Sequence, residues 1–350
     1  MTNRPLITVC IPAYNRAHVL EALLDSILCQ SFDDFEVLIC EDGSPEREAI
    51  RSIARRYAES SIIPVRYQEN VRNLGYDGNL RNLIEQANGQ YCFFMGNDDL
   101  MCPGALSKVA SAVSRYEEVG VVLRTYAAFD GEPENVVQTF RYFDRELFFP
   151  AGSRTISTIY RRAVVIPGLV IHRDAARSWS TDRFDGTLLY QLYLVANILA
   201  DMNAVYLPDV TVLYRNGGTP DFGNSAAERN KFQPKEQTPE SSVHFMKGML
   251  EIARFVEQQR RIPIYNFILR DIANYCYPIL AIQAQRPLPV FLNYAVSLGR
   301  LGFARHPMFH LWFLALLLLG SRRSAIIICW IKEKLGRTPT IGTVYQGEVR

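Results

Sequence analysis

The sequence predicts an α/β fold, in which a parallel sheet is wound with helices on both faces and is followed by a mostly helical region. Three observations predict it. Short apolar runs alternate with stretches of helical periodicity over the first 125 residues. Polar residues gather where the apolar runs end, and from residue 241 onward the periodicity is mostly helical. Alternating strands and helices are typical of a parallel sheet, which binds ligands at the carboxyl ends of its strands.

The expected strands are apolar runs rich in β-branched and aromatic residues, which is typical of strands buried on both faces. The run LITVCI begins at Leu6, FEVLIC is followed by a turn containing Asp42 and Gly43, and YCFFM breaks at Gly96. The strands that we expect are residues 6–11, 35–40, 63–69, 91–95, 119–124 and 204–215.

Helices are expected between these strands because apolar residues recur there at spacings of three and four. Gly89 stops the third helix, and Pro103 suits the first turn of the fourth. Residues 126–168 read as irregular, and residues 217–239 read as a long polar loop. The helices that we expect are residues 18–30, 46–58, 77–88, 103–116 and 186–200, followed by a mostly helical segment from residue 241 to the end.

Composition and charge exclude some classes of protein. The net charge of +2 over 350 residues argues against a nucleic-acid-binding protein held by bulk electrostatics. The seven cysteines are scattered and form no C-x-x-C pair, so we expect free thiols in a reducing compartment. The segment Met1–Pro5 is short and polar, and the first apolar run follows at once, so we expect no secretory signal and a cytoplasmic location.

Two adjacent carboxylates, Asp98 and Asp99, follow the fourth expected strand, where burial and mutual repulsion both oppose their ionisation. A divalent cation such as Mg²⁺ or Mn²⁺ would offset the repulsion between the two carboxylates. Such an ion binds one or two protein carboxylates together with substrate phosphate oxygens. The structural alternative is that Asp98 is a turn residue and that Asp99 caps the helix near Pro103.

Two further polar loops lie at the same edge of the expected sheet. Glu41 and Asp42 follow the second strand, where a carboxylate can accept hydrogen bonds from a nucleobase or a ribose, or can simply form an Asp–Gly turn. Asn15 and Arg16 follow the first strand, after Pro12, and the structural alternative for Asn15 is helix capping. Since the carboxyl ends of parallel strands share one edge, we expect all three loops to form one site.

Together, the three loops resemble the family 2 glycosyltransferases of GT-A fold. The resemblance rests on VCIPAYNRAHVLEALLDSILCQSFDDFEVLICEDGS, on NVRNLGYDGNLRNLIEQANGQY and on MGNDDLMCPGAL; it covers residues 7–106 well and extends more faintly to residue 215. It implies transfer of a sugar from a nucleotide-diphosphate donor. Within the family, the chain is similar to enzymes that act on deoxysugars in surface polysaccharides, such as abequosyl- or rhamnosyltransferases.

The resemblance also implies roles for individual residues. Asp98 matches the last aspartate of the family's D-x-D metal motif and Asp99 matches the acidic residue after it, so both are expected to hold the divalent cation. Gly96 replaces the first aspartate of that motif. The expected donor-binding residues are Pro12, Ala13, Tyr14, Asn15, Arg16, Glu41, Asp42, Asn97 and Arg215.

The family also needs a carboxylate base near the acceptor, often in a Glu–Asp pair before a helix. No such pair precedes residues 186–200, so Asp185, the nearest acid, is the expected base, with helix capping as its alternative. The stretch VLYRNGG resembles the family's Y-R-x-H stretch but lacks the histidine. Arg215 in this stretch is expected to pair with phosphate, or else to form a surface ion pair.

The C-terminal end of the chain is both basic and apolar. From Arg300 onward it has eight basic residues against two acidic ones, and it contains the run FHLWFLALLLLG. That run is shorter than the roughly 18–20 residues that a membrane-spanning helix needs. We therefore expect residues 309–331 to lie peripherally on the inner face of the cell membrane, with packing as a core helix as the alternative. Membrane contact would suit a polyprenyl-linked acceptor.

The resulting expectation is an inverting glycosyltransferase that acts on a saccharide or lipid-linked acceptor in surface polysaccharide synthesis of the O-antigen kind. Its GT-A domain would be residues 1–220, with a nucleotide-sugar half (1–125) and an acceptor half (126–220), followed by a mobile loop (221–240) and a helical, basic region (241–350). One rival is a sugar-nucleotide pyrophosphorylase, whose glycine-rich phosphate loop the stretch PAYNRAH lacks. Another is a membrane-bound partner that has lost catalysis, which Gly96 and the missing Glu–Asp pair favour.

Overall fold

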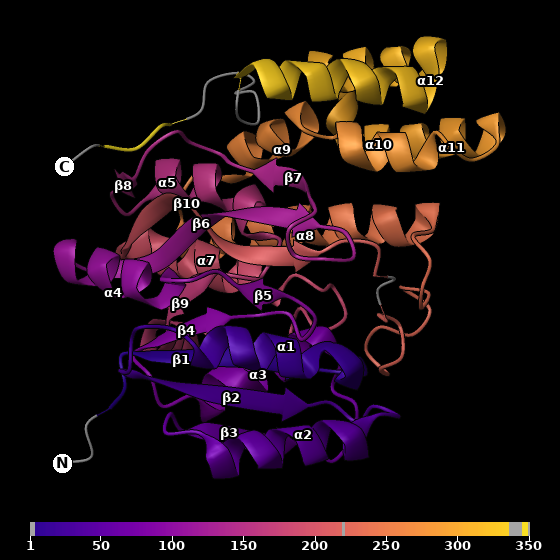
Figure 1. Cartoon of the computed structure of the whole chain (residues 1–350). Coiled ribbons are helices and arrows are strands. Elements are labelled where there is room, and N and C mark those ends of the chain that lie inside the picture. The colour runs from indigo at the N-terminus through magenta and orange to yellow at the C-terminus, as the bar shows by residue number, and fades with distance from the viewer. Residues whose placement is uncertain (1–3, 219–220, 336–344, 349–350) are drawn as a thin grey trace.

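The computed structural model describes residues 4–218, 221–335 and 345–348. Figure 1 shows a twisted sheet with helices on both faces and, above it, a stack of helices from the C-terminal part of the chain. The predicted fold class is confirmed, since strands and helices alternate from the N-terminus to β6. The strands are β1 Ile7–Ala13, β2 Phe35–Glu41, β3 Val65–Glu69, β4 Tyr91–Phe94, β5 Leu100–Met101, β6 Val119–Phe129, β7 Val136–Phe140, β8 Leu147–Phe149, β9 Val170–His172 and β10 Asn203–Arg215.

The strands of the described residues form one sheet in the order β3-β2-β1-β4-β9-β6-β10-β5, with β7 paired to β6 and β8 paired to β10. β1 pairs in parallel with β2 and β4, so the loops that follow these three strands leave the same edge of the sheet. The expected strands all run in the same direction, because β10 pairs in parallel with β6, and β9 lies antiparallel to both β4 and β6. The sequence does not predict the short strand β9, which makes the sheet mixed. The short strands β5, β7 and β8 are also antiparallel to their partners.

The helices follow the predicted periodicity with two corrections. Residues 126–168 are not irregular, because they contain the end of β6 together with β7, β8 and α5. The helix expected from Gly186 begins only at Tyr190, because the preceding turn is held by hydrogen bonds to another element. The helices are α1 Ala17–Leu28, α2 Arg47–Ser60, α3 Gly75–Gln86, α4 Ala105–Arg115, α5 Ser153–Ile159, η1 (3₁₀) Tyr160–Ala163, α6 Arg173–Ser178, α7 Tyr190–Asp201, α8 Pro239–Arg260, α9 Tyr265–Asn274, α10 Tyr277–Gln283, α11 Leu288–Arg300, η2 (3₁₀) Phe303–Arg305 and α12 Pro307–Leu335.

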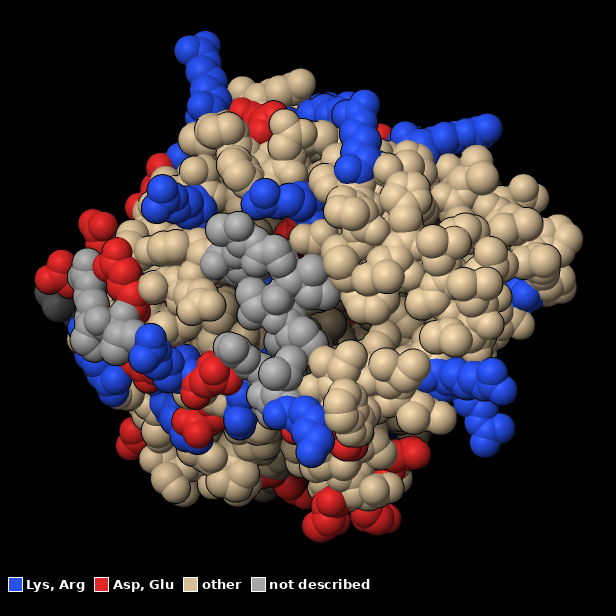
Figure 2. Space-filling view, turned by 90° about the horizontal axis from the view of Figure 1, so that it is seen from above, with Lys and Arg blue, Asp and Glu red and all other residues tan. Residues whose placement is uncertain are grey.

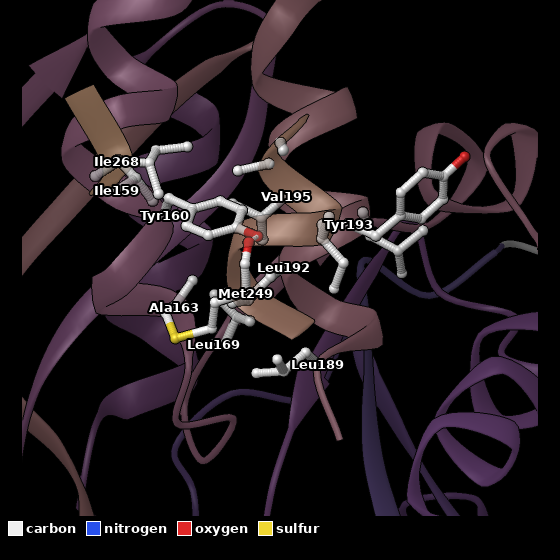
Figure 3. Close-up of a cluster of buried hydrophobic side chains, with 14 of the residues drawn as sticks. Ile159, Tyr160, Ala163, Leu169, Leu189, Leu192, Tyr193, Val195, Met249 and Ile268 are labelled. Carbon is white, nitrogen blue, oxygen red and sulfur yellow. Dashed lines mark hydrogen bonds between the residues drawn. The ribbon is translucent and has the colours of Figure 1, made fainter. Parts of the chain in front are cut away.

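Two apolar layers cover the sheet, and one of them joins the sheet to the C-terminal helices. One layer packs α1, α2 and α4 against one face, whereas the other packs α3, α7, α8 and α9 against the opposite face. Tyr160 lies in the second layer beside Val195, Met249 and Ile268 (Figure 3). Its hydroxyl donates a hydrogen bond to the Met249 carbonyl oxygen at 2.8 Å. The helices from α8 onward therefore share a core with the sheet.

Helix α12 consists of two arms rather than one rod. Gly320 has φ 75° and ψ 168°, which breaks the helix, and Ser324 Oγ lies 3.4 Å from the Ala315 carbonyl oxygen. A straight helix would separate residues nine positions apart by about 13 Å, so the arms fold back on each other. Residues 307–331 are long and apolar enough to cross a membrane by composition. Each arm alone is only about 20 Å long, against the roughly 30 Å of a bilayer core.

The arms of α12 bury one face and expose the other. Phe309 and Leu316 are buried against the helices below, and Trp312 Nε1 donates to the Asn274 carbonyl oxygen at 2.9 Å. On the outer face, Leu318 is 77% exposed and Trp330 is 59% exposed. Further exposed apolar side chains lie on α10, α11 and α12: Ile282, Leu288, Val290, Leu292, Val296, Leu311, Leu314, Leu317, Leu319, Ile326 and Ile327. Seen from above, a wide area without charged side chains has basic side chains along its margins (Figure 2).

Candidate functional site

The loops after β1 and β4 are joined by hydrogen bonds. Asn97 Nδ2 donates to the carbonyl oxygen of Asn15 at 2.9 Å and lies 3.4 Å from that of Tyr14. Asn15 and Arg16 both adopt left-handed backbone angles, with φ of 55° and 64°. A left-handed residue costs about 1–2 kcal/mol unless it is glycine or, to a lesser degree, asparagine, so most of the strain lies in Arg16. The Asn97 amide therefore helps to hold a strained turn at the end of β1.

This turn brings the side chain of Arg16 to Asp98. Arg16 Nη1 lies 2.5 Å from Asp98 Oδ2, and the two side chains are only 25% and 12% exposed. Burial raises the pKa of Asp98, and the Arg16 guanidinium is the main influence that opposes the rise. The structure thus brings together a donor-binding residue and a metal-binding residue that the sequence predicts on separate loops.

Asp99 lies beneath Asp98 and occupies the space beside Gly96. A Cβ added to Gly96 would stand 2.4 Å from Asp99 Oδ2 and 3.4 Å from Asp98 Oδ1, so an aspartate at position 96 would collide with Asp99. Asp99 is 1% exposed, and burial, followed by the nearby Asp98 charge, raises its pKa to about 8. The replacement of the first D-x-D aspartate by glycine therefore makes room for the carboxylate of Asp99.

Arg215, at the end of β10, contacts the same two aspartates, once through its own backbone N–H and once through the backbone carbonyl of Asp98. Its N–H donates to Asp99 Oδ1 at 3.0 Å, and its Nε donates to the Asp98 carbonyl oxygen at 3.0 Å. The guanidinium stacks on the Phe129 ring at 4.7 Å and lies 3.3 Å from the Gly131 carbonyl oxygen. Among the residues that the structure describes, Arg215 forms no ion pair, and its contacts anchor the Asp98–Asp99 loop. Its pairing with a phosphate stays a prediction.

Glu41 and Asp42 lie beside the end of β1 but satisfy their carboxylates within the protein. In register, Pro12 lies beside Cys40 and Ala13 beside Glu41, and the Asp42 N–H donates to the Ala13 carbonyl oxygen. Glu41 accepts hydrogen bonds from the N–H groups of Gly43 and Ser44 and from the Arg47 guanidinium. Its carboxylate thus closes the turn after β2.

Asp42 binds the segment before α3. It accepts hydrogen bonds from Asn70 Nδ2 at 2.7 Å and from the N–H groups of Leu74 and Gly75 at 2.8 and 2.9 Å. Burial raises the pKa of Asp42 to about 6, although these three donors favour the charged form. Asp42 is 3% exposed, so only the edge of its carboxylate would be accessible to a nucleotide.

Asp77, in the first turn of α3, holds the turn before α7 and was not among the expected site residues. Its Oδ2 accepts hydrogen bonds from the N–H groups of Gly186, Thr187 and Leu188, and its Oδ1 accepts one from Tyr190, all at 2.9–3.0 Å. Leu188 there has φ 63°, a strained angle for a leucine. Burial raises the pKa of Asp77 to about 7, against the pull of the backbone donors.

Asp185, the expected base, forms a two-point ion pair with Arg81. Both Arg81 Nη1 to Asp185 Oδ1 and Arg81 Nη2 to Oδ2 are 2.7 Å, and the Asp185 side chain is 24% exposed. Asp77 and Arg81 lie four residues apart on one face of α3, so this helix fixes both the turn and its carboxylate. The spacing places both side chains on one face of α3, but no local pattern in the sequence shows that this face contacts residues 185–190.

The polar loop after β10 folds over the edge where these residues meet. Asp221 Oδ2 lies 3.4 Å from Asn15 Nδ2, and a Cβ on Gly218 would stand 3.6 Å from Asp98 Oδ2. Glu228 accepts hydrogen bonds from the N–H groups of Tyr76 and Gly223. The loop therefore contacts the β1 loop, the β4 loop and α3, and whether it moves stays a prediction.

The family comparison assigns the part of the chain that carries these loops. The model of the glycosyl transferase family 2 matches residues 8–173. Residues 8–173 are a family 2 glycosyltransferase domain. The domain is 33% identical over 102 residues to the abequosyltransferase RfbV of Salmonella typhimurium, which covers 29% of this chain and 31% of that protein. It is 30% identical over 105 residues to the GalNAc(5)-diNAcBac-PP-undecaprenol β-1,3-glucosyltransferase of Campylobacter jejuni, covering 29% and 33%. Each alignment spans about a third of the relative.

Solved structures show that the glycosyltransferase domain and the helices after it have a GT-A fold. TarS 1–349 of S. aureus, solved with UDP-GlcNAc, superposes with a TM-score of 0.58 at 15% identity, over 98% of this chain and 95% of that one. The mannosyltransferase PcManGT of Pyrobaculum calidifontis, solved with GDP-Man and Mn²⁺, gives a TM-score of 0.51 at 16% identity, over 91% and 88%. At these identities the likeness concerns the fold alone.

The glycosyltransferase domain offers a cation few but suitable ligands. Among the residues that the structure describes, no cluster of three or more His, Cys, Asp or Glu side chains could hold a metal. Asp98 Oδ1 and Asp99 Oδ2 both lie within 3.4 Å of the point where a Gly96 Cβ would stand. Two carboxylate oxygens fit Mg²⁺ or Mn²⁺ when substrate phosphates and water complete the shell. The residues present therefore fit such a cation, although Arg16 already contacts Asp98.

At pH 8.5, where the Asp77 carboxylate is ionised, substitution Asp77→Asn is expected to lower the free energy of unfolding by about 3 kcal/mol, because an amide cannot accept at both ends from four backbone N–H groups. The pKa of Asp77 rises to about 7 in the folded state from 3.8, so its share of the stability is present below pH 4 and is lost as the pH rises through 7. Urea denaturation from pH 5.5 to 8.5 measures both effects. The variant should show a shallower fall of stability with pH than the wild type. Parallel curves would contradict the assignment.

Proposed function

We propose that this chain is an inverting glycosyltransferase that moves a sugar from a nucleotide-diphosphate donor to a saccharide or polyprenyl-linked acceptor in surface polysaccharide synthesis. The observation that carries the proposal is the meeting of Arg16, Asn97 and Asp98 at the carboxyl ends of β1 and β4, within a family 2 domain. The acceptor class draws on the relative whose name includes an undecaprenol-linked saccharide. The polysaccharide role draws on the abequosyltransferase.

The donor would lie along the edge formed by residues 12–16, the Glu41–Asp42 turn and Asn97. The outer edge of the Asp42 carboxylate accepts a hydrogen bond from the base or ribose, while its inner bonds keep it fixed. Arg16 places a positive charge where the diphosphate needs one, and Arg215 supports the Asp98 loop from behind. Asp98, with Asp99 beside it, would hold Mg²⁺ or Mn²⁺, which supplies charge that stabilises the departing diphosphate.

Asp185 is our candidate for the base. The acceptor hydroxyl attacks the anomeric carbon from the face opposite the diphosphate, so that a bond to the acceptor oxygen forms as the bond to the diphosphate oxygen breaks. The proton of the hydroxyl passes to Asp185. Its pairing with Arg81 fixes the direction in which the remaining lone pairs of the carboxylate point.

Substitution Asp98→Ala is expected to lower turnover at least about a hundredfold, which is typical of losing one group that stabilises charge in the transition state. Release of nucleoside diphosphate from UDP-, CDP-, GDP- and dTDP-sugars, chosen by thermal shift with Mn²⁺, measures it. Thermal unfolding checks that the variant folds. Near-normal turnover in a folded variant would exclude the role of Asp98.

Substitution Asp185→Asn is expected to lower kcat about a hundred- to ten-thousandfold with little change in donor affinity, because general base catalysis contributes that much. Asp182→Asn is the matched control, since Asp182 is exposed on the same turn. Equal losses in the two variants, or a loss in donor affinity alone, would contradict the assignment of Asp185. Steady-state kinetics with the acceptor varied measures both parameters.

A catalytically inactive membrane partner is the second candidate. Two observations favour it: Gly96 replaces one metal-motif aspartate, and both oxygens of Asp185 are engaged by Arg81. A partner of this kind would bind a nucleotide-sugar in the thermal-shift screen without hydrolysing or transferring the sugar. Slow, cation-dependent hydrolysis of the donor, abolished by Asp98→Ala, decides for the enzyme.

We also propose that residues 309–331 contact the inner face of the membrane peripherally. The fold of α12 supports lying on the surface over crossing, because the break at Gly320 leaves two short arms with exposed apolar faces. Arg322 and Arg323, both exposed, follow the break and suit anionic headgroups. The exposed side chains of α10 and α11 extend the same apolar surface.

Vesicle flotation is expected to show binding that is stronger with phosphatidylglycerol than with phosphatidylcholine alone. Replacing Leu318 and Ile326 by glutamate should abolish binding to both, because both side chains lie on the apolar face. Replacing Arg322 and Arg323 by glutamine should remove up to about 30-fold of the affinity for the anionic vesicles only, at about 1 kcal/mol each. Ile62→Glu is the control, since Ile62 is fully exposed on the sheet domain. Flotation of the Leu318/Ile326 variant at the wild-type level would exclude this surface.

A further inference from the structure

The proposed site for the divalent cation also contains a positive charge of the protein itself, the guanidinium of Arg16. The Arg16 guanidinium touches Asp98 Oδ2 at 2.5 Å, and the same carboxylate is the one that would bind Mg²⁺ or Mn²⁺. A guanidinium and a divalent ion on one carboxylate repel each other strongly where both are partly buried. The two charges therefore compete for Asp98 unless a further anion arrives to separate them.

The backbone around Arg16 shows that this contact is built rather than incidental. Asn15 and Arg16 both hold left-handed angles, which non-glycine residues adopt at a cost. The Asn97 amide on the Asn15 carbonyl oxygen, and Glu46 accepting from the Ala17 N–H at 2.7 Å, fix the turn on both sides of Arg16. The strained turn directs the Arg16 side chain toward the two aspartates instead of along the surface of α1.

The main chain at Gly218 borders the Arg16–Asp98 pair. A Cβ at Gly218 would stand 3.6 Å from Asp98 Oδ2 and 3.7 Å from Arg16 Nη2, which is ordinary van der Waals contact. A diphosphate carries two or more negative charges, and pairs of its oxygens can accept two parallel N–H bonds from a planar guanidinium. Arg16 therefore has a better partner than Asp98 once a diphosphate is present.

We propose, on the basis of the function proposed above, that Arg16 is an exchangeable counter-ion. Without donor, its guanidinium neutralises Asp98 and weakens the binding of a free divalent cation. When a nucleotide diphosphate binds, the guanidinium moves to the phosphate oxygens and leaves Asp98 to the cation. Donor and cation then bind cooperatively, because each relieves the repulsion that opposes the other. Arg16 acts as a positioning residue that makes cation binding depend on the diphosphate.

The proposal predicts that the substitution Arg16→Gln changes the affinities for Mn²⁺ and for pyrophosphate in opposite directions. Calorimetric titration of the full chain with Mn²⁺ alone should show about tenfold tighter binding for Arg16→Gln than for the wild type, within the usual range for coupled sites. Titration with inorganic pyrophosphate at saturating Mn²⁺ should show the reverse, about tenfold weaker binding for the variant. A structural role alone would weaken both. Arg16→Lys, which keeps the charge, should restore the wild-type Mn²⁺ affinity.

Two further variants separate this inference from the function on which it rests. Arg215→Gln is the matched control, since that guanidinium contacts the Asp98 carbonyl oxygen instead of the carboxylate, and it should change the Mn²⁺ affinity less than Arg16→Gln. Asp98→Asn should abolish Mn²⁺ binding. If Asp98→Asn abolishes it while Arg16→Gln does not tighten it, the exchange is wrong and the cation site stands. If neither wild type nor Arg16→Gln binds Mn²⁺ with or without pyrophosphate, both are wrong. Thermal unfolding confirms that each variant folds.

Discussion

Buried carboxylates at one edge of a sheet must each be matched by hydrogen-bond donors or a guanidinium, and this constraint organises the structure around the site. Taking a carboxylate out of water without a partner costs several kcal/mol. Glu41 is therefore paired with Arg47 and two N–H groups, and Asp185 with Arg81. Asp98 is paired with Arg16. Each of these carboxylates is fixed by donors on the loops and helices that it joins in turn.

The same matching joins the two halves of the sheet domain. Asp77 lies on α3, within residues 1–125, yet its four hydrogen bonds fix the turn before α7, within residues 126–220. Glu228, from the loop after β10, accepts from the Tyr76 N–H next to it. The distance between the metal-motif edge and Asp185 is thus set by side chains of α3. Catalysis by the two together, as proposed, needs that distance to be fixed before the donor binds.

The sequence predicts the local parts of this arrangement and not the long-range ones. Strand β1 and helix α1 follow from short periodic patterns, and the three polar loops share an edge because parallel strands place them there. The start of α7 at Tyr190 depends on Asp77, more than a hundred residues earlier, which no local pattern reveals. Strand β7 was taken as irregular because it is an exposed edge strand with little apolar alternation.

The sequence also does not predict the contacts that individual side chains make. The motif predicts that Arg215 pairs with a phosphate or forms a surface ion pair, but it does not predict the stacking on Phe129 or the backbone acceptors that hold the guanidinium in the structure. Gly96 looked like a loss in the metal motif, and only the position of Asp99 shows what the missing side chain makes room for. In both cases the partner comes from a fold-dependent neighbour rather than from a fixed spacing along the chain.

The break at Gly320 has a consequence for how the proposed enzyme meets its acceptor. If the two arms lie in the plane of the membrane, as proposed, the exposed apolar side chains of α10, α11 and α12 fix which side of the molecule faces the bilayer. In Figure 1 the arms lie across the top of the molecule, and the loop after β10 hangs at the side below them. If the arms lie on the membrane as proposed, a lipid-linked acceptor would approach the loop after β10 from the side of the molecule that carries α12.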